Sequence, residues 1–141
     1  MNLNNFKQIN DEFGYRVGNL VLKVVAEHLL DNVHECDTVF HHGDSAFVIL
    51  LADIAHTVAV EQTAMNLLTI FSDSLAVDGH KVTITMSIGI SIYPDDGKDM
   101  HSLIEHADIA LYQARVKSEH TCGFLTTGRN GKTVDMRRET L

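Results

Sequence analysis

The chain alternates stretches of helical and strand-like hydrophobic spacing. Over residues 18–32 apolar side chains recur every three or four positions with charged residues on the opposite side, which predicts an amphipathic helix. A short helix is expected before it, broken by a turn at 13–15, where Gly14 permits the change of direction. A second long helix is predicted over 54–72. A third is expected after Asp99, a residue type suited to cap a helix start.

Short runs rich in β-branched and aromatic residues predict strands between these helices. Residues 38–42 and 46–51 flank a polar turn at Gly43, which is typical of a β-hairpin. Residues 75–77, an Asp-Gly turn and the long alternating run 81–94 predict a second hairpin that ends at a proline.

The end of the chain predicts a closing strand and then a polar tail. "CGFLTT" has the composition of a strand, whereas residues 127–141 are polar and are interpreted as a tail or linker. Helices that alternate with antiparallel hairpins indicate an α+β fold in which helices cover a mostly antiparallel sheet.

Composition narrows the functional classes. A chain of 141 residues is one domain by length, and its formal net charge of −8 disfavours a nucleic-acid partner. Two cysteines give no disulfide framework, so a reducing, cytoplasmic location is expected. No run approaches the length of a membrane span, and the first ten residues lack the pattern of a secretory signal.

Four segments stand in a fixed order along the chain: "NNFKQINDEFGYRVGNLVLKVVAEHL", "HHGDSAF", "VTITMSIGIS" and "HADIALYQAR". Together they resemble the GGDEF domain of diguanylate cyclases over residues 2–117, and we assign this domain to residues 1–126. The resemblance implies a palm like that of nucleotidyl cyclases. In active members it also implies a dimer that joins two GTP molecules into cyclic di-GMP with two Mg²⁺ ions.

The resemblance places neutral residues where active members carry metal-binding acids. The first metal-binding aspartate falls on Asn2, the adjacent backbone carbonyl on Leu3, and the acidic pair of the signature on Ser45 and Ala46. The five signature positions are occupied by Gly43, Asp44, Ser45, Ala46 and Phe47. Amide and hydroxyl groups lack the negative charge that favours Mg²⁺. We therefore expect no catalytic residues and no cofactor, with Mg²⁺ present only if GTP binds.

The nucleotide-contacting positions are partly altered. Four residues remain candidates for nucleotide binding: Lys7, Asn10, Asn19 and Arg115. Asn19 replaces the aspartate that pairs with guanine, and Glu119 reverses the charge of an arginine. The arginine and aspartate of the family's product-inhibition site fall on His34 and Asp37. We interpret this site as degenerate because a histidine lacks the fixed charged fork of arginine.

Structural interpretations stand beside these functional ones. Zinc at His34, Cys36, His41 and His42 is disfavoured because their spacing matches no common structural site. The asparagines at 2, 10 and 19 form either a weakened nucleotide pocket or helix caps and turns. Residues 44–45 are interpreted as ordinary turn residues.

The family's first central strand should end at Asn2, yet the apolar stretch that forms it is not present before this residue. The sequence therefore predicts a gap in the middle of the sheet with two unpaired edges, unless further polypeptide or a partner fills it. The scaffold positions elsewhere remain apolar or aromatic, among them Phe6, Leu22, Phe47, Ile88 and Tyr112.

These observations predict a folded but catalytically inactive GGDEF domain that acts as a regulatory, dimerisation or signal-relay module. Residues 127–141 resemble a linker toward an EAL phosphodiesterase domain, so the expected partners are a neighbouring EAL or sensory domain and a second copy of the chain. One alternative is a GTP sensor without turnover that uses Lys7, Asn10 and Asn19. The other is a cyclase that works with substitute metal ligands.

Overall fold

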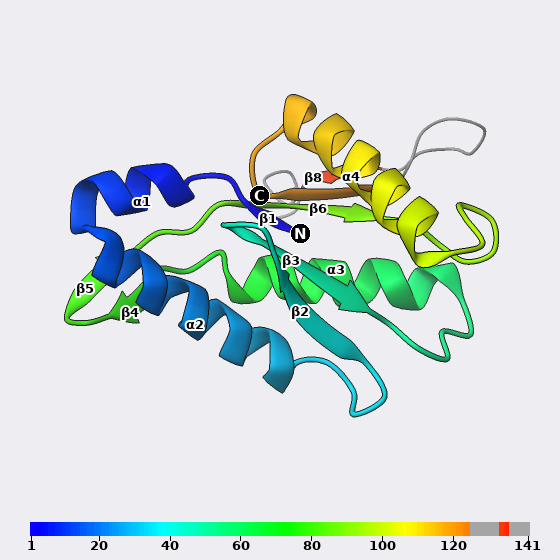
Figure 1. Cartoon of the computed structure of the whole chain (residues 1–141), viewed down its shortest axis with the longest axis horizontal. Helices are drawn as coiled ribbons and strands as arrows, with labels where there is room; N and C mark the ends of the chain where they lie inside the picture. Colours follow the sequence, from blue (N-terminus) through cyan, green and yellow to red (C-terminus); the bar gives the residue numbers. More distant parts are fainter. Residues whose placement is uncertain (125–132, 136–141) are drawn as a thin grey trace.

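The computed structural model describes residues 1–124 and 133–135 (Figure 1). The helices are α1 (Phe6–Phe13), α2 (Tyr15–Asp31), α3 (Thr57–Ile70) and α4 (Met100–Lys117). The strands are β1 (Asn2–Leu3), β2 (Thr38–His42), β3 (Ala46–Leu50), β4 (Leu75–Val77), β5 (His80–Val82), β6 (Met86–Ile90), β7 (Thr121–Phe124) and β8 (Thr133–Asp135).

Six of the strands form one sheet in the order β2-β3-β1-β6-β7-β8, and β4 and β5 pair separately. All pairs in the large sheet are antiparallel except β6 with β7. This arrangement confirms the expected α+β fold with a mostly antiparallel central sheet. Because Asn2 lies opposite both Ala46 and Ser87, the start of the chain lies in the middle of the sheet.

Helices pack on the sheet through apolar faces. The buried stripe of α2 comprises Val17, Gly18, Val21, Val25 and Leu29, and it joins a core that includes Phe71 and Met86. Figure 1 shows α4 running alongside β6. This approach requires a glycine in β6, since a Cβ atom at Gly89 would collide with the carbonyl of Ala107.

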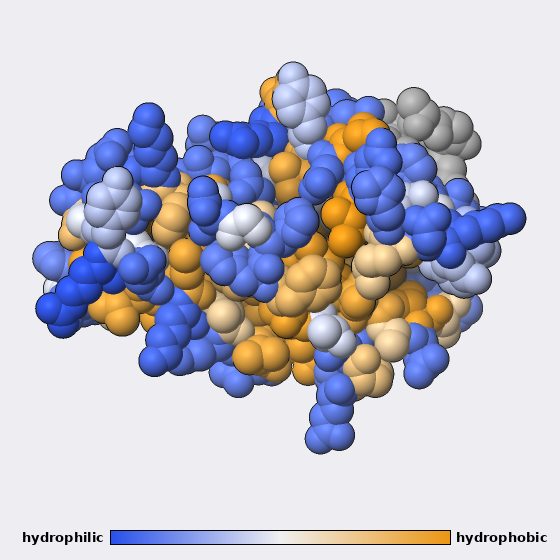
Figure 2. All heavy atoms as spheres, viewed as in Figure 1, coloured by the Kyte–Doolittle hydropathy of each residue, from blue (hydrophilic) through white to orange (hydrophobic). Residues whose placement is uncertain are grey.

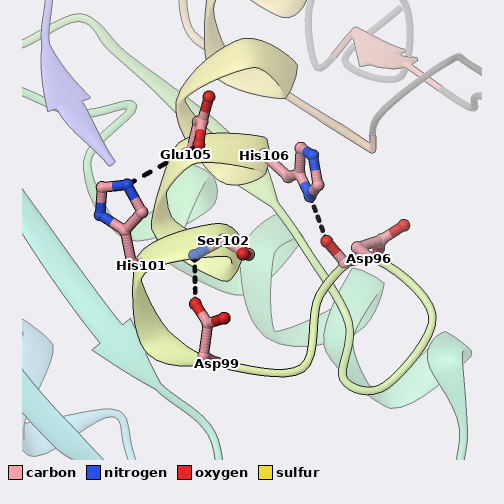
Figure 3. A network of polar contacts seen from close by, with 6 residues as sticks. All are labelled: Asp96, Asp99, His101, Ser102, Glu105 and His106. Atoms are coloured by element: carbon pink, nitrogen blue, oxygen red, sulfur yellow. Dashed lines mark hydrogen bonds and ion pairs between the residues drawn. The ribbon is translucent and has the colours of Figure 1, made fainter.

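The start of α4 confirms the predicted cap. The carboxylate of Asp99 accepts a 2.8 Å hydrogen bond from the backbone N–H of Ser102 (Figure 3). Hydrogen bonds from Ser102 lower the pKa of Asp99 below its ordinary value. The ring of His106, one turn further along, donates from Nδ1 to the backbone carbonyl of Asp96 and so ties the preceding loop to α4 (Figure 3).

The predicted second hairpin is wrong in its long strand. Residues 81–94 do not form one strand, because the chain leaves β5 at Val82 and enters the large sheet only at Met86. The side chain of Asn5 spans this break: Nδ2 donates to the carbonyl of Thr83 at 2.7 Å, and Oδ1 accepts from the N–H of Thr85 at 3.1 Å. Asn5, almost 80 positions away in sequence, thus provides hydrogen-bond partners for the backbone of Thr83 and Thr85, where strand pairing is interrupted.

The predicted gap in the sheet is partly filled. Two-residue β1 lies between β3 and β6 and joins the two halves, so the sheet is not divided as the sequence suggested. The N-terminal amine of Met1 donates to the carbonyl of Phe47 at 3.0 Å, and the N–H of Phe47 donates back to the carbonyl of Met1 at 2.8 Å. Met1 therefore makes the hydrogen bonds of a strand residue.

Two further expectations changed. Thr133–Asp135, inside the interval interpreted as a tail, forms β8 and pairs with β7. The rest of 127–141 and all of "LTT" lie outside the described residues. Tyr112 was expected to pack, but it is 69% exposed on the outer side of α4. In the described part of the chain, no helix combines the length and the apolar character that crossing a bilayer requires.

Candidate functional site

The two positions that should hold metal ligands lie against each other. Asn2 is in β1 at the centre of the sheet, and Ser45 is the last turn residue before β3 in the β2–β3 hairpin. The hydroxyl of Ser45 donates to Oδ1 of Asn2 at 3.2 Å, and the N–H of Leu3 donates to the carbonyl of Ser45 at 2.9 Å. The structure therefore joins these two positions by a neutral hydrogen bond.

A second polar pair lies beside this one and was missed from the sequence. Asn4 and the fully buried Ser87 exchange hydrogen bonds of 2.9 and 3.3 Å between the start of the chain and β6. Together with Asn5, they fix the turn that carries the chain from β1 into α1. The only local signal was a run of asparagines between a strand and a helix, which is also typical of an ordinary turn.

The tip of the hairpin is stabilised by its own residues. Gly43 has a φ of 70°, which favours glycine, and the carbonyl of the exposed Asp44 accepts a 3.3 Å hydrogen bond from Nε2 of His41. The ring of His41 stacks on Phe47 with centroids 5.1 Å apart. These contacts favour the interpretation of 44–45 as turn residues.

The residues at this site do not suit a pair of Mg²⁺ ions. Mg²⁺ prefers carboxylate and phosphate oxygens, and Asn2, Ser45 and Ala46 supply one amide, one hydroxyl and one methyl group. The Asn2 and Ser45 oxygens are already joined to each other. Over residues 1–124 and 133–135, no three His, Cys, Asp or Glu side chains gather as a metal site would need, and this includes the histidines considered for zinc.

The guanine-contacting candidates lie on the first two helices. Asn10 in α1 has a buried Oδ1 without a hydrogen-bond partner in the described structure, and this atom lies against Gly18 of α2. Any side chain at position 18 would collide with it. Asn19, which follows Gly18 in α2, is exposed, and so is Lys7 of α1. The structure thus brings Asn10 against Gly18 at the α1–α2 contact.

The remaining candidates have other surroundings. Both carboxylate oxygens of Asp37 accept backbone hydrogen bonds of 2.9 Å, from the N–H of His34 and from the N–H of Ala52. Asp37 therefore holds two loops together, and its link to His34 does not involve the imidazole. Arg115 is exposed in the last turn of α4, where a cation favours the helix dipole, and Glu119 is exposed just beyond this helix.

A comparison with protein families decides the assignment. The family model of the diguanylate cyclase GGDEF domain matches residues 1–121. The chain belongs to the GGDEF family. In solved structures, an EAL/GGDEF domain protein from M. capsulatus superposes on this GGDEF domain with a TM-score of 0.83 and 32% identity, covering 88% of this chain and 80% of that one.

Curated relatives are much longer than this GGDEF domain. It is 34% identical over 135 residues to the bifunctional diguanylate cyclase/cyclic di-GMP phosphodiesterase MucR of Pseudomonas aeruginosa, covering 96% of this chain and 20% of MucR. It is 32% identical over 110 residues to diguanylate cyclase A of Treponema denticola, covering 78% of this chain and 30% of that protein. The chain therefore spans less than a third of either relative, and it represents a domain of cyclic di-GMP signalling proteins.

Proposed function

We propose that this GGDEF domain does not catalyse cyclic di-GMP synthesis and instead acts as a regulatory, dimerisation or signal-relay module. The observation that carries the proposal is the 3.2 Å hydrogen bond between the Ser45 hydroxyl and Asn2 Oδ1, at the two positions where carboxylates would hold metal. Without negative charge at either position, nothing there offsets the free energy of dehydrating Mg²⁺.

A relay role needs two arrangements of the domain that differ in their contacts with a neighbour. The preserved core supports a folded scaffold that could transmit such a change. The similarity to MucR and to the EAL/GGDEF protein from M. capsulatus supports an EAL phosphodiesterase domain or a sensory domain as the neighbour. A second copy of the domain is a further proposed partner, and a cytoplasmic location is proposed because two cysteines give no disulfide framework.

One observation favours a second candidate, a GTP-binding domain without turnover. A buried polar atom without a partner is costly, and Oδ1 of Asn10 is such an atom. A guanine N–H at the α1–α2 contact would satisfy it. Exposed Lys7 and Asn19 stand on the same two helices.

Isothermal titration calorimetry of the full chain with GTP and Mg²⁺ separates the candidates. The regulatory proposal predicts no binding heat. Heat without cyclic di-GMP, abolished by Asn10→Leu, would instead support the GTP sensor, and formation of the cyclic dinucleotide would overturn both. An exposed substitution on the same helix at a residue with no proposed role, Gln8→Ala, is the matched control and should leave any binding heat unchanged.

A further inference from the structure

The outer side of α4 carries large apolar side chains that remain exposed. Ile109, Tyr112 and Val116 are 42%, 69% and 69% exposed. The helix packs on the sheet through its opposite side, where Ala110 and Ala114 are buried. In Figure 2, apolar atoms lie beside hydrophilic ones along the position that α4 occupies in Figure 1. The outer side of α4 is therefore an apolar surface in contact with solvent.

The spacing of these side chains is typical of two helices that pair. Four residues follow one another at intervals of four, three and four positions: Glu105, Ile109, Tyr112 and Val116. This spacing is that of the a and d positions of a coiled coil, and it places all four on one stripe of the helix. We call these four residues the α4 stripe. Because a and d side chains pack between those of a facing helix, the α4 stripe suits a helical partner.

Charges beside the α4 stripe indicate which partner fits. Exposed Asp108 and Arg115 lie seven residues apart, so they occupy the same flank and the same g position of the heptad. Among the described residues, neither side chain forms an ion pair, although the charge of Asp108 also acts on the amine of Met1. One flank of the α4 stripe therefore offers an acid at one end and a base at the other.

A second copy of α4 matches these charges only when it packs antiparallel. In an antiparallel pair, g positions face g positions, so Asp108 of each copy faces Arg115 of the other. A two-fold axis forms both ion pairs at once, which closes the assembly at two copies. In a parallel pair the g positions face the e positions, which hold His106 and Gln113, and neither of these offers a fixed charge.

We propose that the α4 stripe is a self-association surface on which a second copy of the chain packs its own α4 in antiparallel orientation. Ile109 of each copy packs against Tyr112 of the other, between the two Asp108–Arg115 ion pairs. This proposal rests on the dimerisation role put forward above and names the surface for it. A single helix face is a small interface, and the net charge of −8 opposes association, so the dimer is weak and transient.

Sedimentation equilibrium of the 141-residue chain without nucleotide, at concentrations up to about 1 mM, tests the surface. Tyr112→Glu buries a charge in the proposed contact and should raise the dimer Kd by roughly a hundredfold. Leu30→Glu changes a residue of α2 that is 59% exposed, and as the matched control it should leave the Kd unchanged. A chain that is monomeric at every concentration overturns the proposal, and so does a dimer that Tyr112→Glu leaves intact.

An exchange of charges tests the antiparallel orientation. Arg115→Glu alone places two acids opposite each other and should raise the Kd by roughly tenfold. Asp108→Arg combined with Arg115→Glu restores opposite charges and should return the Kd to within about threefold of the unchanged chain. A structural role of Arg115 within one copy predicts no such recovery, so a double variant as weak as Arg115→Glu would overturn the proposed pairing.

These outcomes are separate from those that test catalysis. A dimer that none of the α4 variants weakens would leave the dimerisation role in place and exclude the α4 stripe as its surface. Formation of cyclic di-GMP would overturn the proposed inactivity without bearing on the Kd of the dimer.

Discussion

In the 141-residue chain, the buried amine of Met1 makes the stability depend on pH in a defined direction. Burial lowers the pKa of this ammonium from 8.0 to about 6, and the nearby carboxylate of Asp108 partly opposes the shift. The folded state therefore binds fewer protons than the unfolded state between these values, so stability rises with pH through this window. Two pKa units at 1.36 kcal/mol each correspond to about 2.7 kcal/mol. This contribution to the free energy of unfolding is present above pH 8 and lost below pH 6.

Nα-acetylation removes this titration and keeps an N–H for the hydrogen bond to Phe47. Urea unfolding of the free and acetylated chains is measured from pH 5.5 to 8.5. Because both chains have the same histidines, their contribution cancels in the difference between the two free energies of unfolding. The acetylated chain should gain about 2.7 kcal/mol relative to the free chain as the pH falls from 8.5 to 5.5. In the free-amine chain, Asp108→Asn should steepen the pH dependence, since it removes a charge that favours the ammonium. Identical pH profiles for the free and acetylated chains would refute the burial of the amine.

Four further variants test other parts of the account. His120→Ala removes hydrogen bonds to the backbone of α3 and β6 and should cost about 2 kcal/mol in urea unfolding; a loss below about 0.5 kcal/mol contradicts this. Gly89→Ala should cost about 3 kcal/mol because the methyl group has no space beneath α4, and unchanged stability would show that the helix can move away. Asp99→Ala should lower the melting temperature at pH 7 but not in strong acid. Because the pKa of Asp99 is lowered in the folded state, its stabilising effect is lost as the pH falls through that pKa. Equal melting temperatures of the two chains at pH 7 would argue against the cap. Asn2→Asp combined with Ser45→Asp should destabilise the chain by like-charge repulsion. The free energy of unfolding of this double variant should then rise by about 1 kcal/mol when Mg²⁺ reaches about five times its Kd, whereas the unchanged chain should not respond. No gain in the double variant would show that charge alone does not make the site.

Local pattern was sufficient for the helices and the first hairpin. The apolar spacing of α2 and the capping position of Asp99 are properties of adjacent residues, and the structure confirms both. The break between β5 and β6 depends on Asn5, a residue remote in sequence, so alternation of residue types could not reveal it. Tyr112 was misjudged because it was taken as a packing position from the resemblance, whereas α4 buries Ala110 and Ala114 of its apolar stripe and leaves Tyr112 exposed.

The candidate site was predictable in position but not in contacts. The resemblance placed Asn2 and Ser45 at the metal-binding positions, and the sheet register brings them within hydrogen-bond distance. The use of Asp37 to hold two loops and the unpartnered oxygen of Asn10 depend on three-dimensional packing. A cleft beside Met1 lies where the sequence predicted a gap in the sheet, whereas the two-residue β1 that joins the two halves was not expected.

The central claim is that the neutral pair Asn2–Ser45 cannot support the metal-dependent joining of two GTP molecules. The most direct measurement incubates the purified chain with GTP and Mg²⁺ and quantifies cyclic di-GMP by chromatography, with an active GGDEF protein as the positive control. We predict that no cyclic di-GMP forms at any Mg²⁺ or protein concentration at which the chain remains folded. Time-dependent formation of cyclic di-GMP that scales with the concentration of this chain would contradict the claim.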